Sequence, residues 1–238
     1  MAEGEAVGRS DFGGIPRSIR IGDASLATWP DGQRLEVLID RTVVITRFAD
    51  VDAYHPALLE AVVAARADAR FVDANPNPSP WACGFKVRNL PQWPSSAALL
   101  VHARALALAH QVMERGPVYA DDTWASIYRA GDYCMPHSHL RCDASVVYML
   151  DPGDTDPADE AAGKLMIMDP RLAWCCSHEP GRATRPLMPL MEPGHMIAFA
   201  GECVHSVTPC RGSRPRITMS WNMTRTRLPG EPRRKPQR

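Results

Sequence analysis

Short segments in which apolar and polar residues alternate fill the chain from Thr123 onward, separated by Gly, Pro and Asp. These segments are TWASIYRAG, ASVVYMLDPG, KLMIMDP, HMIAFAG, VHSVTP and RITMSWNM. Alternation with a period of two is typical of strands that bury one face. Many short strands at such spacing predict a β-sandwich or a barrel-like jelly roll.

Helical periodicity is confined to two earlier stretches. HPALLEAVVAARADAR carries apolar residues at helical spacing after Pro56. SSAALLVHARALALAHQVMERG begins with serines suited to an N-cap and stops at Gly116. RLEVLIDRTVVITRFAD, before the first helix, predicts one or two strands. The expected fold class is therefore an all-β core with flanking helices (α+β), jelly-roll or cupin-like.

The length of 238 residues favours one large domain over two complete ones. Residues 1–33 show no sustained period and are expected to be a flexible N-terminal arm. Residues 34–227 are expected to form the single domain, with the jelly-roll core from about residue 117. The basic segment 228–238 has almost nothing apolar to bury and is expected to be a disordered tail.

Charge and cysteine content narrow the function classes. Lys plus Arg and Asp plus Glu number 27 each, so no overall basic field is present to hold nucleic acid. Seven cysteines without a C-x-x-C pair, and no signal-peptide pattern, indicate a cytoplasmic protein with reduced thiols. No apolar run approaches the roughly 20 residues that cross a bilayer. We expect a small-molecule substrate, and a homodimer is one assembly that the sequence leaves open.

The stretch from Trp124 to Tyr148 contains the candidate chemistry, because it sets His137 and His139 two residues apart between predicted strands. Residues i and i+2 of a strand project from the same face and can bind one ion. His205, after an apolar run far downstream, supplies a third imidazole. Such a set suits a redox-active Fe(II) with open positions for a cosubstrate and oxygen. Paired strand histidines can instead hydrogen-bond inside a polar barrel, but the addition of His205 favours the metal site.

The identity of the third ligand is open between two residues. The common facial triad has a carboxylate where His139 stands. Asp143, four residues beyond His139, is the alternative if the strand continues unbroken. We favour His139. A three-histidine site carries one negative charge less than the common triad. This difference changes the reduction potential of iron or allows another metal to bind.

Alternation in RITMSWN places Arg216, Thr218 and Asn222 on one face of a strand. Arg216 can form a bidentate pair with a carboxylate, and Thr218 adds a hydroxyl. This arrangement predicts a clamp for the distal carboxylate of 2-oxoglutarate. Arg214 has the same parity and competes for this role, but the proline between the two favours a turn at Arg214. Asn222 is assigned to the substrate pocket.

Two neighbouring strands supply further candidates for the pocket. Ser126 and Tyr128 share parity on the strand before the histidine pair, and Tyr128 is expected to donate its hydroxyl to the cosubstrate or to close the pocket. Trp124, of the same parity, is expected in the core. On the next strand Ser145 is chosen as the inward residue over Tyr148. Ser126 and Ser145 join Asn222 as candidate substrate or pocket residues.

The order of these motifs resembles a bacterial family of 2-oxoglutarate/Fe(II)-dependent oxygenases with an H-x-H…H…R motif. The likeness covers about residues 38 to 225 and rests on W-x-S-x-Y, H-x-H, S-x-x-Y, G-K-L, D-P-R, P-G, H-S-V and R-I-T-M-S-W-N. The sequence departs from the family at Val146, where Gly is usual. The resemblance implies a double-stranded β-helix in which Fe(II) is bound by His137, His139 and His205, and 2-oxoglutarate by Arg216 with Thr218 and Tyr128.

The resemblance also implies the reaction. Such an enzyme uses molecular oxygen to hydroxylate a small molecule, such as an amino acid or a natural-product intermediate, and releases succinate and carbon dioxide. No catalytic residue beyond the metal ligands is expected, because the metal carries out the difficult chemistry. The alternative is a three-histidine cupin-type metal dioxygenase or isomerase that does not use 2-oxoglutarate. A non-enzymatic jelly-roll binding module is the third interpretation.

Overall fold

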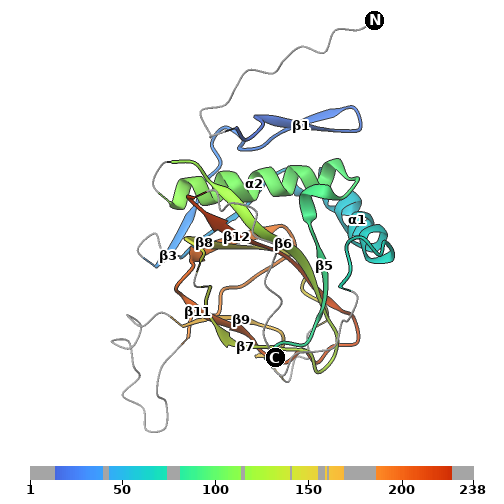
Figure 1. Ribbon diagram of the computed structural model, residues 1–238, viewed down its shortest axis with the longest axis vertical. Coiled ribbons are helices and arrows are strands. Elements are labelled where there is room, and N and C mark those ends of the chain that lie inside the picture. The colour runs from blue at the N-terminus through green and yellow to red at the C-terminus, as the bar shows by residue number, and fades with distance from the viewer. Residues whose placement is uncertain are drawn as a thin grey trace, which may run out of the picture.

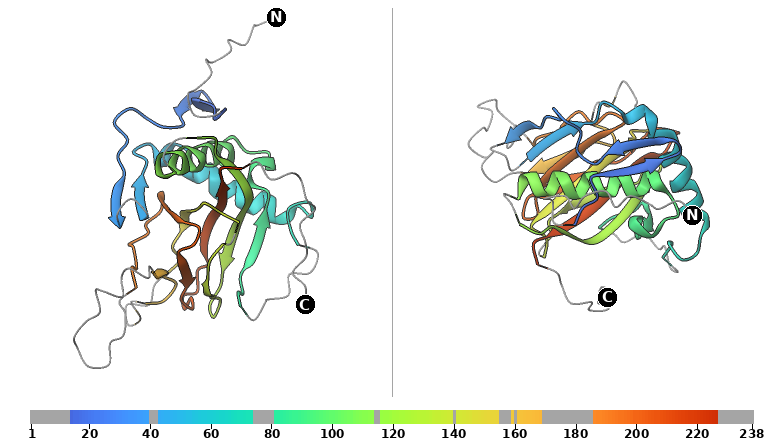
Figure 2. Two further views of the ribbon diagram at one scale, coloured as in Figure 1. Left: turned by 60° about the vertical axis from the view of Figure 1, so that its left-hand side comes forward. Right: turned by 90° about the horizontal axis from the view of Figure 1, so that it is seen from above.

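The computed structural model describes two facing sheets with helices over one of them. The described residues are 14–39, 43–73, 81–113, 116–139, 141–154, 159, 161–168 and 186–226. The predicted tail at 228–238 and the D-P-R motif at 169–171 lie outside these ranges. A helical layer covers one side of the large sheet, and a small sheet lies opposite its other side (Figures 1 and 2).

The large sheet has the strand order β3-β4-β10-β8-β12-β6-β5, and all its neighbours are antiparallel. Its strands are β3 (Glu36–Ile39), β4 (Val43–Arg47), β5 (Phe85–Arg88), β6 (Tyr119–Tyr128), β8 (Ala144–Asp151), β10 (His195–Ala200) and β12 (Arg216–Thr224). The small sheet, in the order β7-β11-β9, consists of β7 (Cys134–His137), β9 (Leu165–Met168) and β11 (Val204–Val207). The predicted fold class, a jelly-roll core with flanking helices, is confirmed.

Strand β5 is absent from the sequence-based expectations. It follows the turn-rich run ANPNPSPWACG, and its four residues are too few for alternation to be recognised. Antiparallel pairing with β6 makes it an edge strand of the large sheet. This strand brings an additional side chain to the pocket described below.

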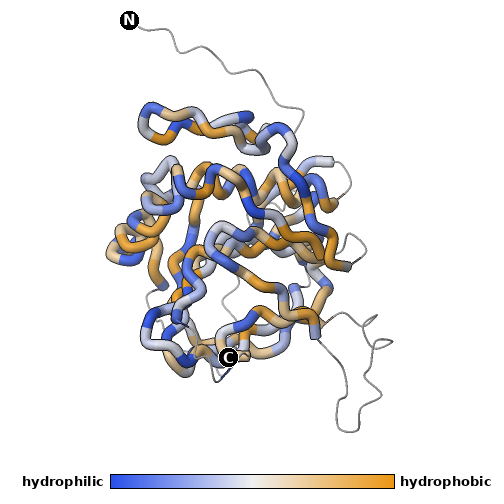
Figure 3. The backbone as a smooth tube through the Cα atoms, turned by 180° about the vertical axis from the view of Figure 1, so that it is seen from behind, coloured by the Kyte–Doolittle hydropathy of each residue, from blue (hydrophilic) through white to orange (hydrophobic). Residues whose placement is uncertain are grey.

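Two α-helices, α1 (His55–Ala67) and α2 (Ser96–Val112), form the predicted helical layer. The hydroxyl of Ser95 accepts a hydrogen bond from the Ala98 amide at 3.2 Å, so the predicted N-cap is present. Two short 3-10 turns, η1 (Val51–Ala53) and η2 (Leu90–Gln92), precede the helices. Apolar residues run along both helices and the central strands (Figure 3). Within the described ranges, neither helix has the length and apolar character needed to span a bilayer.

A hairpin of β1 (Ser18–Ile21) and β2 (Ala24–Ala27) lies within the segment expected to be a flexible arm. Gly22 makes the tight turn between the strands, with a φ of 58° that favours glycine. Ile19, Ile21 and Leu26 pack against the main hydrophobic core. The described structure therefore begins before residue 34, and two four-residue strands were too short to give a periodic signal in the sequence.

Arg104 on α2 joins the hairpin to the helical layer. Its side chain is fully buried, and its Nη1 and Nη2 atoms donate to the carboxylate of Asp50 at 2.8 and 2.7 Å. The Nη2 atom also donates to the carbonyl of Ala27 on β2 at 2.8 Å. The guanidinium carbon lies 4.2 Å from the ring centroid of Phe48, within cation–π range. One cation on α2 thus contacts two other segments, β2 at Ala27 and the stretch from Phe48 to Asp50.

We expect Arg104→Met to lower the free energy of unfolding by about 3 kcal/mol, because it leaves the partly buried carboxylate of Asp50 and the Ala27 carbonyl without a donor. Urea titration followed by circular dichroism measures this change. Arg70→Met is the control, because the ion pair of Arg70 with Asp68 lies on the surface. A midpoint for Arg104→Met equal to that of the wild type would contradict the assignment of Arg104 as a structural link.

His102 on α2 accepts a hydrogen bond on Nδ1 from the indole nitrogen of Trp221 on β12 at 3.0 Å. Accepting on Nδ1 requires this nitrogen to be unprotonated. Burial lowers the pKa of His102 from 6.5 to about 4. The folded state therefore holds this imidazole neutral at a pH where the unfolded chain already binds a proton.

The free energy of unfolding should consequently fall as the pH is lowered from 7 to 5. His102 contributes about 1 to 2 kcal/mol to this fall, because its folded pKa lies below its unfolded pKa. His102→Gln keeps an acceptor for Trp221 but cannot titrate, so the fall in this variant should be smaller by that amount. Urea titrations at the two pH values measure the difference. Parallel pH dependence in both proteins would contradict the neutral, buried imidazole.

Candidate metal centre

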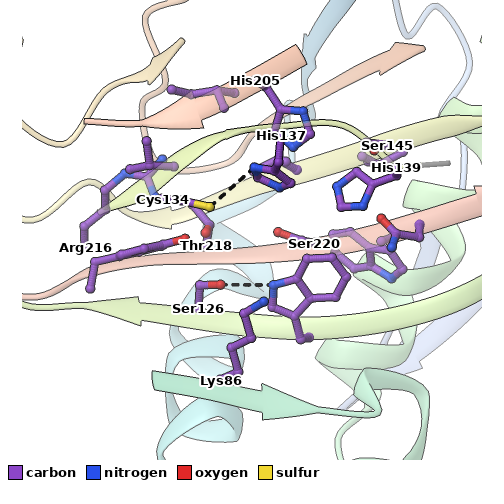
Figure 4. Close-up of a pocket in the computed structure, with 18 residues that line it drawn as sticks. Lys86, Ser126, Cys134, His137, His139, Ser145, His205, Arg216, Thr218 and Ser220 are labelled. Carbon is purple, nitrogen blue, oxygen red and sulfur yellow. Dashed lines mark hydrogen bonds between the residues drawn. The ribbon is translucent and has the colours of Figure 1, made fainter. Parts of the chain in front are cut away.

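Three histidines meet between the two sheets. His137 ends β7 and is the register partner of His205 on β11. The ring centroid of His137 lies 4.3 Å from that of His205 and 5.1 Å from that of His139. One potential ligand atom from each histidine lies within 4.8 Å of the others. The structure therefore brings together the three residues that the sequence nominated (Figure 4).

His139 lies on the turn after β7, not on the same strand as His137 as expected. The sequence suggested one strand for both members of the H-x-H pair, but β7 ends at His137. The backbone N–H of His139 donates to the carbonyl of Gly201 at 3.0 Å, which holds the turn after β7 against the end of β10. A Cβ at Gly201 would collide with the backbone carbonyl of Cys142, so this close approach requires glycine.

The imidazoles are set up to act as neutral ligands. The Nδ1 of His205 lies 3.0 Å from the Cys203 carbonyl, and the Nδ1 of His137 lies 2.8 Å from the Met135 carbonyl. When Nδ1 carries the proton for such a bond, Nε2 keeps its lone pair for a metal. Burial lowers the pKa of His205 to about 3 and that of His139 to about 4. Both are therefore unprotonated at neutral pH.

No carboxylate joins the three histidines among the residues that the structure describes. Asp143, the alternative third ligand, is exposed, and its Oδ2 accepts a hydrogen bond from the backbone N–H of Arg225 at 2.7 Å. It does not line the pocket beside the histidines. The geometry favours His139 over Asp143.

Arg216 lies in the same pocket with much of its guanidinium unpaired. Its side chain is buried, and neither Nε nor Nη1 has a hydrogen-bond partner among the described residues. Burial lowers the pKa of Arg216, and its guanidinium carbon lies 5.5 Å from the ring centroid of Tyr128. A buried cation with free donors is costly unless an anion binds it. Arg214, its competitor, is instead exposed and forms an ion pair with Asp151 at 2.7 Å.

The polar floor of the pocket comes from β6, β8 and β12. Ser126 and Thr218 are cross-strand neighbours, and Ser145 is the neighbour of Asn222. All four line the pocket, and the buried Oδ1 of Asn222 has no hydrogen-bond partner in the part of the chain that the structure describes. Burial raises the pKa of Tyr128 to about 12, so its phenol stays protonated and can donate.

The choice of Ser145 over Tyr148 as the inward residue of β8 agrees with the structure, whereas the expected core position of Trp124 is wrong. Tyr148 is fully buried on the opposite face of β8 from Ser145, and its hydroxyl lies 3.0 Å from the Nδ1 of His55. Trp124 was expected in the core but lines the pocket, where its indole N–H donates to the Ser126 hydroxyl at 3.0 Å. The reason is that Trp124 shares the inward parity of Ser126, so an aromatic side chain is part of the pocket wall.

The sequence analysis did not nominate Lys86 or Cys134, although both line the pocket. Lys86 lies on the unpredicted strand β5, and Cys134 lies on β7 with its Sγ 3.5 Å from the Nδ1 of His137. The order C-x-x-H was the only signal for Cys134, and the two-residue alternation in Phe85–Arg88 was the only signal for Lys86.

Comparison with known proteins agrees with this geometry. Residues 122–222 match the family model described as "Putative 2OG-Fe(II) oxygenase". This span contains the three histidines and Arg216. No curated protein matches the chain in sequence.

Solved structures with similar folds include an oxidoreductase of the 2OG-Fe(II) oxygenase family from Burkholderia pseudomallei, with 14% identity, a TM-score of 0.52, and coverage of 79% of this chain and 87% of that chain. A Pseudomonas putida prolyl-4-hydroxylase has 16% identity, a TM-score of 0.51, and coverage of 76% and 92%. The non-heme alpha ketoglutarate dependent epimerase SnoN from nogalamycin biosynthesis has 14% identity, a TM-score of 0.55, and coverage of 76% of each chain. At these identities the likeness shows the fold.

The family model matched by residues 122–222 implies Fe(II) and 2-oxoglutarate as cofactors, because 2OG-Fe(II) oxygenases use both. The donor set fits both: imidazole nitrogen suits iron, and the unpaired guanidinium of Arg216 suits a carboxylate. Residues 122–222 of the chain thus match a 2OG-Fe(II) oxygenase family model, and the chain has the double-stranded β-helix fold of the solved structures to which it is similar.

Proposed function

We propose that this protein hydroxylates a small molecule with Fe(II) held by His137, His139 and His205. The observation that carries the proposal is the position of three clustered imidazoles beside one buried arginine with unpaired donors in a single pocket. Bound Fe(II) would activate molecular oxygen, coupled to the oxidation of 2-oxoglutarate to succinate and carbon dioxide. All protein ligands would lie on one side, which leaves the opposite side for cosubstrate and oxygen.

Arg216, Thr218 and Tyr128 would bind 2-oxoglutarate. The Nε and Nη1 atoms of Arg216 are available for its distal carboxylate. Tyr128 lies beside the guanidinium, and its protonated phenol can donate to the same group. Thr218 is two residues from Arg216 on β12 and faces the same pocket. Leu165 and Val207 form apolar walls that limit access of water.

The substrate would lie against the remaining polar groups of the floor, Ser126, Ser145 and Asn222. The pocket is lined by residues of both sheets, and we assign it an amino acid or a natural-product intermediate in preference to a polymer. The balanced charge of the chain agrees with this choice. A cytoplasmic protein with one catalytic domain at about residues 34–227 fits the same interpretation, and the hairpin before residue 34 packs on that domain.

A cupin-type dioxygenase or isomerase is the second candidate, because it also uses three histidines. It would bind its substrate directly at the metal and would need no second anion site. The buried, unpaired guanidinium of Arg216 favours the 2-oxoglutarate enzyme over this alternative.

Addition of Fe(II) and then 2-oxoglutarate to metal-free protein without oxygen should give the visible charge-transfer band of the chelated cosubstrate. Arg216→Met should weaken binding of 2-oxoglutarate about 100-fold, because charge-assisted hydrogen bonds are lost. Arg214→Met is the matched control and should bind normally, since Arg214 lies outside the pocket. Iron binding without a band in the wild type would favour the cupin-type candidate, and absence of iron binding would reject the catalytic proposal.

Variants of the two candidate third ligands should differ in metal affinity. We expect His139→Ala to weaken Fe(II) binding by about 10-fold or more, because one of three protein donors is lost. Asp143→Asn should leave the affinity unchanged, and His139→Asp should recover much of it by creating the common two-histidine, one-carboxylate set. Anaerobic competition with a coloured chelator measures these affinities. The opposite ranking of the Ala and Asn variants would assign the role to Asp143.

A further inference from the structure

Lys86 extends into the metal pocket from an edge strand. It is the cross-strand neighbour of Ser126, which is in turn the neighbour of Thr218, so the three form one row on the inner face of the large sheet. Its Nζ lies 4.9 Å from the ring centroid of Trp124. The same ring lies 6.5 Å from the ring of His139. Lys86 is therefore held one aromatic ring away from the candidate metal ligands (Figure 4).

The ammonium group of Lys86 has no acceptor among the residues that the structure describes. The nearest carboxylates are engaged by Arg88, which forms ion pairs with Asp73 at 2.9 Å and Asp122 at 3.5 Å. No Asp or Glu lines the pocket within the described ranges. Burial and the positive charge of Arg88 lower the pKa of Lys86. The contact with the indole ring orients the ammonium but cannot satisfy its three N–H donors.

The positive charge of the pocket indicates that an anion besides 2-oxoglutarate binds there. Three neutral histidines leave both charges of a divalent metal uncompensated, and Arg216 adds another. The two carboxylates of 2-oxoglutarate would be used at the metal and at Arg216. Arg216 and Lys86 lie on different strands with β6 between them and approach the pocket from different sides (Figure 4). The charge of Lys86 thus stays unpaired after the cosubstrate is bound.

We infer that Lys86 binds an anionic group of the substrate, a carboxylate or a phosphate, beside His139. This inference rests on the proposed function and makes it more specific: the substrate is a small acid whose charged group is anchored on β5. A short, directed contact of this kind would fix which C–H bond of the substrate lies next to the metal. Lys86 is accordingly a substrate-positioning residue, and Trp124 is its support.

Benzoate and phenyl phosphate are suitable probes, because they present the two candidate groups on the same uncharged ring, and benzamide is the neutral control. Their dissociation constants are measured by calorimetry on the full chain, metal-free and loaded anaerobically with Fe(II) and 2-oxoglutarate. We expect at least one anion to bind the loaded wild type, and Lys86→Met to weaken it about 10- to 100-fold. The anion that binds identifies the chemical group. Lys86→Arg should retain most of the affinity.

Lys86→Gln serves as a second uncharged variant in case the Met variant does not fold, and Arg211→Met is a surface control for the loss of one positive charge. Equal affinity in the wild type and the uncharged variants, or binding of neither anion, overturns the inference. Loss of the 2-oxoglutarate band in Lys86→Met also overturns it, because Lys86 would then belong to the cosubstrate site. Anion binding that depends on Lys86 in metal-free protein, without any band in the wild type, rejects the oxygenase function while supporting the anion site.

Discussion

The alternation of side chains along β12 is the constraint on which both the core and the pocket depend. Met219, Trp221 and Met223 are fully buried beneath the helices, whereas Arg216 and Thr218 face the opposite sheet. β12 is paired on both sides, with β6 and with β8. A shift of register by one residue would exchange these two sets of side chains. The burial energy of the apolar set therefore also holds the polar set in the pocket.

The small sheet contributes the other half of the site by a different route. None of the described helices covers it, and its strands are short, but the pairing of β7 with β11 places His137 directly opposite His205. His139 lies beyond the strand and depends on the backbone contact with Gly201. The candidate ligand set thus combines two histidines on paired strands with a third on a turn, whose position depends on the close approach of two backbone segments.

The pocket is unusual in its balance of charge. The described lining contains Arg216, Lys86 and three histidines but no carboxylate. An enzyme with the common facial triad compensates part of the metal charge with its own ligand. Here bound anions would have to offset the positive charge of the site. Electrostatic attraction would therefore contribute more to the binding of the cosubstrate and the substrate. Neutral imidazoles, kept unprotonated by burial, are compatible with this arrangement.

The sequence by itself determined the two helices, the strands from residue 123 onward, and the nomination of His137, His139, His205 and Arg216, because these depend on local periodicity and spacing. Only the tertiary structure decided that His205 lies opposite His137, and that Asp143 lies outside the cluster. Strand β5, which carries Lys86, and the N-terminal hairpin were likewise found only in the tertiary structure. These features depend on register between segments far apart in the chain, and on strands of four residues, for which a local pattern contains too little information.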